Sequence, residues 1–305
     1  MTAVRAIAMA GIVVQFLWPA AGYCGEAASD AVLKDEMSKQ QAIYQGRGAQ
    51  QLEGYIIDRS LLAYSFVLSK AFDTALAKLG PNDRWLDIGA GQGRAVADYY
   101  SERYDSMHPE GREQRGTKAS SVAMSIEDRR TDEWHKAAAG LEPGKMQYVT
   151  GKPLRDYSAA ELGRFQLVTD VIGGFSYTSD LSRFVGRVLE ILTTGGDFFT
   201  ILQDVHSQDE DNKPYYAGSP YLTEITGADG SELKVCGWLR SITCVQVTCE
   251  IRSDWAPPVE VYRVHKTCDD VRVPALTRVH YQAGTPPERG FRLEKAPAAP
   301  GDTAR

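Results

Sequence analysis

Apolar and polar positions follow two alternating periods along the middle of the chain. Short apolar runs bounded by polar residues predict buried strands at residues 85–88, 122–126, 146–150, 165–168 and 198–202. Helical periodicity is clearest from residue 181 to 192, where apolar side chains recur on one face: Leu181, Phe184, Val185, Val188, Leu189 and Leu192. Because strands and helices alternate, the pattern favours an α/β fold with a largely parallel sheet covered on both faces.

The flanking regions carry clear patterns of their own. Residues 59–79 place apolar side chains near one helical face, and Gly80-Pro81 is typical of a helix end. Residues 245–251 and 259–264 alternate apolar with polar side chains on either side of Pro257-Pro258. Two such strands joined by a proline-containing loop predict an antiparallel pair.

The chain begins with a segment that resembles a leader. Arg5 precedes an apolar run over residues 6–18, and small residues follow at 19–22, which is the order of a secretory signal peptide. The run is shorter than the roughly 20 apolar residues of a membrane span. The alternative is an N-terminal helix of the fold itself.

We therefore expect five segments along the chain. They are a signal peptide at 1–28, a helical arm at 29–80, an α/β core at 81–205, a part completing the sheet at 206–284, and a flexible tail at 285–305. If the leader is genuine the protein is exported, to the periplasm or outside the cell; otherwise it is cytoplasmic.

A glycine-rich loop joins the first predicted strand to a helix. The strand carries Asp87 near its end, and Gly89, Gly91 and Gly93 follow at alternate positions. Glycines at this spacing let the backbone turn tightly and let a ligand approach it closely. The dinucleotide fingerprint requires a further glycine where this chain has Arg94. Asp87 would also repel a pyrophosphate, whereas it suits a ligand that carries an ammonium group.

The D-x-G-x-G-x-G pattern resembles motif I of the class I S-adenosylmethionine-dependent methyltransferases. Three further motifs follow in the order found in that family. Glu127 matches the acidic residue that grips the ribose hydroxyls, 165–170 resembles the fourth-strand motif, and 192–196 resembles the L-x-x-G-G turn. The resemblance extends from about Arg59 to about Lys266.

The resemblance implies a three-layer Rossmann-like methyltransferase fold. Its sheet would be seven-stranded and mostly parallel, with an antiparallel C-terminal strand pair. It also implies S-adenosylmethionine as the cofactor, bound by Asp87, Gly89, Ala90, Gly91, Gly93, Glu127 and Asp170.

Three features of the sequence depart from the family pattern. The loop before Glu127 is long, so 106–121 is an insertion. Lys152 follows Gly151 where an acidic residue usually holds the adenine amine, and Gln166 replaces the usual aspartate of the fourth strand. The adenine contact is therefore unassigned.

Methyl transfer is an in-line displacement at an activated sulfonium, so positioning supplies much of the acceleration. Asp170 ends the fourth predicted strand, where open α/β sheets bind ligands, and is the candidate for contact with cofactor or acceptor. The alternative is that Asp170 caps the turn at 172–174. His206 is either a general base or a surface histidine.

These features predict methyl transfer to an unidentified acceptor, more in keeping with a small molecule than with a macromolecule. The net charge of −6 and pI near 5.5 argue against nucleic-acid binding. No metal is expected, and the oligomeric state is left open. One alternative is an exported, non-catalytic protein that keeps the fold as a ligand-binding module. A nicotinamide-dependent oxidoreductase is disfavoured by Arg94 and Asp87.

Four late cysteines predict two disulfides, in keeping with export. Cys244 and Cys249 are an odd number of positions apart, so their side chains would point to opposite faces of a strand and could not bond to each other. We favour Cys236–Cys244 with Cys249–Cys268, and the crossed pairing remains open. Cys249 is expected on the apolar face with Val245, Val247 and Ile251.

Overall fold

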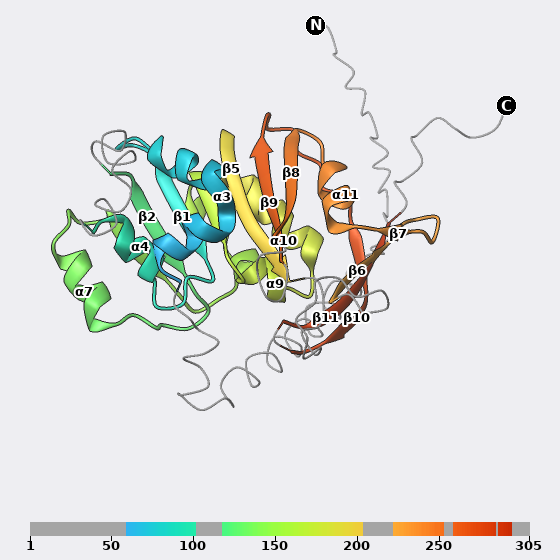
Figure 1. The fold of residues 1–305 in the computed structure, drawn as a ribbon, viewed down its shortest axis with the longest axis horizontal. Helices are drawn as coiled ribbons and strands as arrows, with labels where there is room; N and C mark the ends of the chain where they lie inside the picture. Colours follow the sequence, from blue (N-terminus) through green and yellow to red (C-terminus); the bar gives the residue numbers. More distant parts are fainter. Residues whose placement is uncertain (1–58, 102–117, 204–221, 253–258, 285, 295–305) are drawn as a thin grey trace, which may run out of the picture.

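The computed structural model describes residues 59–101, 118–203, 222–252, 259–284 and 286–294. Within these ranges the chain forms a seven-stranded sheet and a four-stranded sheet (Figure 1). The strand order of the larger sheet is β3-β2-β1-β4-β5-β9-β8. Its strands are β1 Arg84–Ile88, β2 Ser120–Met124, β3 Met146–Val149, β4 Phe165–Asp170, β5 Leu192–Gln203, β8 Val245–Arg252 and β9 Val259–Lys266.

The first five strands pair in parallel, whereas β9 pairs antiparallel with both β5 and β8. This is the topology of the class I methyltransferase fold, so the predicted fold class is confirmed. The chain starts at β1 in the middle of the sheet and runs outward to β3. It then crosses back to β4, which makes the junction of β1 and β4 a topological switch point. Open α/β sheets bind ligands at such points, beyond the carboxyl ends of the strands.

Each face of the larger sheet has its own apolar core, as the three-layer prediction requires. Trp85 packs with one group of helices, and its neighbours Leu86 and Ile88 pack on the opposite face. The first group is α3 (Leu61–Ala77), α4 (Arg94–Tyr99) and α7 (Asp132–Ala139). The second group is the 3₁₀ turn η1 (Leu154–Asp156), α8 (Ala159–Leu162), α9 (Gly174–Tyr177), α10 (Leu181–Ile191) and α11 (Val235–Arg240).

Helix α10 confirms the clearest helical pattern in the sequence. Asp180 caps its first turn by accepting a hydrogen bond from the backbone N–H of Arg183 at 3.1 Å. All of its predicted apolar positions are buried. Strand β5 begins at Leu192, earlier than the predicted residue 198, because Leu192 already pairs with Phe165 of β4.

Helix α3 is interrupted at Ser69. This residue has φ 72° and ψ 171°, a backbone conformation that is essentially confined to glycine. The interruption divides the helix into a first half, 61–68, and a second half, 70–77. At the end of the first half, the guanidinium of Arg252 donates to the carbonyl oxygens of Phe66 at 2.8 Å and Val67 at 3.2 Å.

A second sheet, which the sequence patterns did not predict, follows the core. Its strands are β6 (Thr223–Thr226), β7 (Glu232–Leu233), β10 (Leu276–Gln282) and β11 (Glu288–Leu293), in the order β10-β11-β6-β7. Within the expected segment 206–284, β8 and β9 belong to the larger sheet, whereas β6, β7 and β10 belong to the second sheet. The flexible tail expected at 285–305 is wrong for 288–293, because β11 pairs with both β10 and β6.

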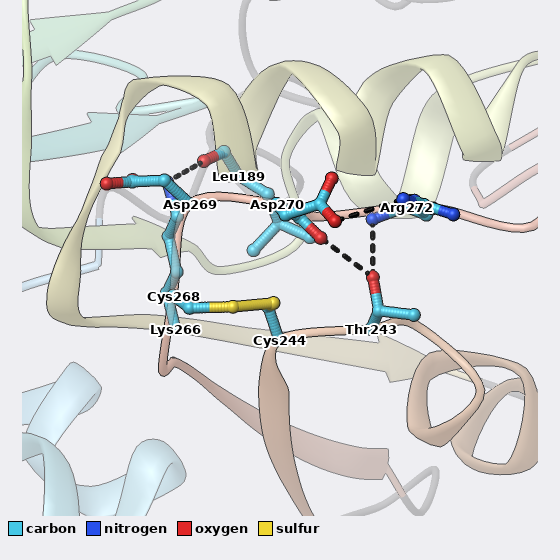
Figure 2. Close-up of a disulfide and its surroundings, with 8 residues drawn as sticks. All are labelled: Leu189, Thr243, Cys244, Lys266, Cys268, Asp269, Asp270 and Arg272. Atoms are coloured by element: carbon cyan, nitrogen blue, oxygen red, sulfur yellow. Dashed lines mark hydrogen bonds and ion pairs between the residues drawn. A yellow bond between two sulfur atoms is a disulfide. The ribbon is translucent and has the colours of Figure 1, made fainter.

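The disulfide pairing differs from the one that we favoured. Cys236 bonds to Cys249, with a Cα–Cα distance of 6.1 Å. Cys244 bonds to Cys268, with a Cα–Cα distance of 5.0 Å, and Figure 2 shows this second disulfide. The reason is strand register: Val245 at the start of β8 lies opposite Lys266 at the end of β9. The cysteines just beyond these two ends, Cys244 and Cys268, therefore meet.

The prediction that Cys249 lies on the apolar face of its strand is confirmed. Cys249 is partly buried on the same face of β8 as Val245 and Val247 and packs against the core. Helix α11 contacts β8 and brings Cys236 to this face. Ile251, expected on the same face, is 53% exposed.

A buried lysine at the end of β9 joins the main sheet to the end of α10. The ammonium of Lys266 donates to the carbonyl oxygen of Leu189 at 3.0 Å and forms an ion pair with Asp269 (Figure 2). It also donates to the carbonyl oxygen of Leu192 at 2.9 Å. These carbonyls belong to the last turn of α10 and the residue after it. A cation at this end of a helix satisfies carbonyl oxygens that lack a helical partner.

The expected leader lies outside the described residues, and export stays a prediction. In the part of the chain that the structure describes, no helix has the length and apolar character needed to cross a bilayer.

We predict that peptide mapping without reduction recovers the Cys236–Cys249 and Cys244–Cys268 cross-links. Replacing both Cys236 and Cys249 by serine opens a loop of 13 residues. We expect this change to lower the free energy of unfolding by about 3 kcal/mol, measured by urea denaturation. A Cys236–Cys244 cross-link would contradict the register that joins β8 to β9.

Candidate functional site

The glycine loop between β1 and α4 has the geometry that its sequence predicts. Gly89, Gly91 and Gly93 all adopt positive φ values, 71°, 58° and 82°. The backbone N–H of Ala90 donates to the carbonyl of Met124 at 2.9 Å, and that of Gly93 donates to Ala90 at 2.8 Å. The loop is therefore bound to the carboxyl end of β2 and turned back on itself.

Two of these glycines also allow close packing from neighbouring elements. A Cβ atom at Gly89 would lie 2.5 Å from the Cα of Gly173, in the loop after β4. A Cβ atom at Gly93 would lie 2.3 Å from the ring of Trp134, on α7. Neither contact is sterically acceptable, so only glycine fits at both positions. The carbonyl of Gly91 accepts a short hydrogen bond from the hydroxyl of Tyr148 on β3.

Asp87 is fully buried at the end of β1 and is held by two hydroxyl groups. The hydroxyl of Tyr64, from the first half of α3, donates to both carboxylate oxygens at 3.0 and 3.1 Å. The hydroxyl of Thr169 on β4 donates to Oδ1 at 2.7 Å. Burial, together with the charge of Asp87, raises the pKa of Tyr64 well above its usual value, so Tyr64 stays protonated and acts as the donor.

Glu127 lies just beyond β2, on the same edge of the sheet as the glycine loop. Its side chain is 27% exposed and forms an ion pair with Arg129 at 2.7 Å. Its backbone carbonyl accepts from Tyr148 at 3.4 Å, and the same hydroxyl contacts Gly91. Tyr148 thus connects Glu127 with the glycine loop. The sequence patterns did not identify Tyr148 as a site residue, because a tyrosine on a strand is usually part of the hydrophobic core.

The edge next to Glu127 presents apolar surface. Ile126 is 48% exposed, and its carbonyl accepts from the backbone N–H of Gly151 at 3.0 Å. A Cβ atom at Gly151 would meet nothing within 4 Å. Lys152, which stands where the family usually has an acid, pairs instead with Glu161 at 2.7 Å.

Asp170 is buried beneath the turn that follows β4. Its Oδ1 accepts from the backbone N–H of Gly173 at 2.8 Å, and its Oδ2 accepts from Phe175 at 2.9 Å. Burial raises its pKa to about 7, and these N–H groups oppose that rise. The hydrogen bonds are those of the turn-capping alternative, and contact with a cofactor or an acceptor stays a prediction.

Strand pairing brings most of the predicted residues to one edge of the sheet. Asp87 lies opposite Ala123 of β2 and Thr169 of β4. The glycine loop, Glu127 and the turn after Asp170 therefore adjoin at the switch point. The residues that lead into α3 reach the same edge, because the Arg59 guanidinium donates to the carbonyl of Val171 at 2.8 Å.

Other candidate positions have a structural role or lie outside the described residues. Gln166 accepts a hydrogen bond from the backbone N–H of Arg84 at 2.7 Å and so joins β4 to the start of β1. His206 and most of the 106–121 insertion are among the residues that the structure does not describe. Among those that it does describe, no three His, Cys, Asp or Glu side chains are grouped to hold a metal.

Gly93→Ala tests the packing of the loop. We expect the variant to have a lower free energy of unfolding than the wild type. A residue with a Cβ in the left-handed conformation costs about 1–2 kcal/mol. The clash of this Cβ with the ring of Trp134 lowers the stability further. The matched control is Gly186→Ala in α10, where a Cβ meets nothing within 4 Å and a small gain is expected. Equal stabilities of the two variants in urea denaturation would contradict this geometry.

The pH dependence of stability tests the burial of Asp170. Its native pKa of about 7 exceeds the usual 3.8, so the native state retains a proton that the unfolded state loses between these values. Stability therefore falls as pH rises through this window, by up to about 1.4 kcal/mol per pH unit, and levels off above it. Asp170→Asn should remove this component from urea denaturation measured between pH 4 and 8. An unchanged slope would show that Asp170 does not titrate there.

The known proteins that this chain resembles are found among solved structures. No protein-family model and no curated protein matches the chain. Similar solved structures include the magnesium protoporphyrin IX methyltransferase of Synechocystis PCC 6803 with bound S-adenosylmethionine, at 10% identity and a TM-score of 0.45, covering 76% of this chain and 97% of that one. The CurJ carbon methyltransferase is 15% identical with a TM-score of 0.45, over 81% and 68% of the two chains. An rRNA methylase of Streptococcus thermophilus is 10% identical with a TM-score of 0.38, over 65% and 95%. At these identities the similarity concerns the fold.

Proposed function

We propose that the chain binds S-adenosylmethionine and transfers its methyl group to a small-molecule acceptor. The observation that carries this proposal is the glycine loop at the switch point, with Asp87 before it and Glu127 on the neighbouring strand end. Asp87 would pair with the methionyl ammonium of the cofactor. The positive φ of Gly91 and its lack of a side chain would let the cofactor approach the backbone.

The nucleoside half of the cofactor would lie along the end of β2. Glu127 is partly exposed there, and one carboxylate can accept from both vicinal ribose hydroxyls. Ile126 offers an exposed apolar surface for the adenine ring, and Gly151 leaves open space beside it. This assigns an apolar contact to adenine where the family's acidic residue is missing.

The chemical step would be displacement of the methyl group from the sulfonium by the acceptor. The protein's main contribution is then alignment of the two reactants, and a base is needed only for an acceptor that carries a proton. Both oxygens of Asp170 are occupied by backbone N–H groups, so we assign it to shaping the loop after β4. The catalytic base, if one is required, is left unassigned.

The acceptor would enter beside the loop that follows β4. The second sheet binds the end of α9, the helix that follows this loop. The hydroxyl of Tyr281 donates to the carbonyl of Tyr177 at 3.0 Å, and Arg289 donates to that of Thr178 at 2.7 Å. We therefore propose that the second sheet borders the acceptor site. The net charge of −6 disfavours a nucleic-acid acceptor.

A second candidate function is supported by the two disulfides. Such bonds persist in oxidising compartments, which agrees with the proposed leader and export. In a compartment without S-adenosylmethionine, the fold would serve as a ligand-binding module without turnover. Cofactor binding without transfer to any acceptor would favour this function.

Isothermal titration of the chain with S-adenosylhomocysteine, S-adenosylmethionine and NAD tests the proposal. We expect both sulfur compounds to bind and NAD not to bind. Asp87→Asn and Glu127→Gln should each weaken binding by about 10–100-fold, because each removes a charged hydrogen-bond partner. Gly91→Val should abolish binding. Asp128→Asn, at an exposed neighbour of Glu127, is the control and should bind as the wild type does. Binding of NAD alone would contradict the proposal.

A further inference from the structure

The carboxylate proposed to hold the cofactor's ammonium is closed off by another side chain. Asp87 has no exposed surface, and Tyr64 above it is only 3% exposed. The Tyr64 hydroxyl spans the two carboxylate oxygens, at 3.0 Å from one and 3.1 Å from the other. A ligand that donates directly to Asp87 must therefore displace this hydroxyl.

We propose that Tyr64 is a gate on the cofactor site: its hydroxyl occupies the ammonium position on Asp87, and binding requires the first half of α3 to withdraw. This inference rests on the proposed function, since it takes the ammonium of S-adenosylmethionine as the competing donor. The chemistry of the exchange is balanced, because one hydrogen-bond donor replaces another on the same carboxylate. The replacement carries a positive charge, and a charged donor bonds a carboxylate more strongly than a phenol does.

Thr169 holds the carboxylate of Asp87 in place while one hydrogen-bond donor replaces the other. Its hydroxyl donates to Oδ1 of Asp87 at 2.7 Å and accepts from the indole N–H of Trp85 at 2.9 Å. Both partners lie on β1, and Thr169 lies on the neighbouring strand β4 of the central sheet. Asp87 therefore keeps its orientation when Tyr64 leaves, and only the donor from α3 changes.

The break in α3 supplies a hinge for this movement. Ser69 has the φ of 72° that divides the helix. Beyond it, the second half is anchored by buried Phe72 and Leu76, and Phe72 packs edge-on against Phe199 of β5 with ring centroids 5.8 Å apart. The first half also buries Leu61, Val67 and Leu68. In this proposal it turns about Ser69 as one unit, while Phe72 and Leu76 stay in place.

The far end of the first half is tied to both sides of the proposed site. Arg59 binds the carbonyl of Val171 in the loop after β4, and the backbone N–H of Leu61 donates to Asp98 of α4 at 3.0 Å. Both contacts are partly buried polar bonds, which water can replace. The outer face of the same segment exposes Leu62 and Phe66. The segment thus crosses the switch point as a strap joined to the elements that hold the cofactor.

Calorimetry and thermal unfolding of Tyr64→Phe in the full chain test the gate. Loss of the hydroxyl should lower the melting temperature of the ligand-free protein. It should also lower the dissociation constant for S-adenosylhomocysteine about tenfold. The reason is that Asp87 is then accessible to the ligand in a larger fraction of the molecules. The matched control is Tyr100→Phe, which loses hydrogen bonds to the carbonyls of Ala119 and Lys145 on the other side of α4. It should lower the melting temperature and leave the affinity unchanged.

The outcomes distinguish failure of the proposed cofactor binding from failure of the proposed gate. A wild-type chain that does not bind S-adenosylhomocysteine overturns the proposed function, whatever the variant does. Wild-type binding with unchanged or weaker binding by Tyr64→Phe overturns the gate alone. If Tyr64→Phe does not fold, hydrogen exchange of the wild type decides: ligand should speed exchange of 61–64 relative to 70–77. Slower or unchanged exchange at 61–64 overturns the gate.

Discussion

The structure depends on one buried carboxylate and the donors that surround it. Asp87 lies at the centre of the sheet edge with no exposed surface, and an unpaired charge there would be strongly destabilising. The indole of Trp85 donates to the hydroxyl of Thr169, which donates to this carboxylate, and the hydroxyl of Tyr64 donates to it from α3. Two central strands and the covering helix α3 are thereby fixed around the point where the glycine loop begins.

Close backbone approach and local strain concentrate around this carboxylate. Gly89 and Gly173 bring the glycine loop and the loop after β4 into direct contact, and neither position has room for a side chain. Ile172, beside that contact, and Ser69, in the covering helix, both adopt positive φ without being glycine. Strained backbone of this kind persists where the surrounding packing enforces it, and it is typical of ligand sites and hinges. The proposed cofactor site has both features at one sheet edge.

Local sequence patterns predicted helices and strands, but they did not predict contacts between residues that are distant in the sequence. The periodicity of 181–192 and the alternation in 245–251 marked α10 and β8, because each pattern reflects which face is buried. Strand β11 was missed, since Arg289-Gly290-Phe291 has no clean alternation and pairs with strands far away in the chain. The favoured disulfide pairing was wrong and the crossed pairing, which had stayed open, is the one observed. The reason is that strand register, which places Val245 opposite Lys266, is set by the whole hairpin. Tyr64 and Tyr148 could not be found from sequence, because their partners lie 23 and 57 residues away.

A crystal structure of the chain with S-adenosylhomocysteine tests the account most directly. The account predicts the ligand along the carboxyl ends of β1 and β2, with its amino group on Asp87, its ribose hydroxyls on Glu127 and its adenine against Ile126. The hydroxyl of Tyr64 would no longer contact Asp87. Ligand bound at another edge of the sheet, or bound at this edge with Tyr64 still closing off Asp87, would contradict it.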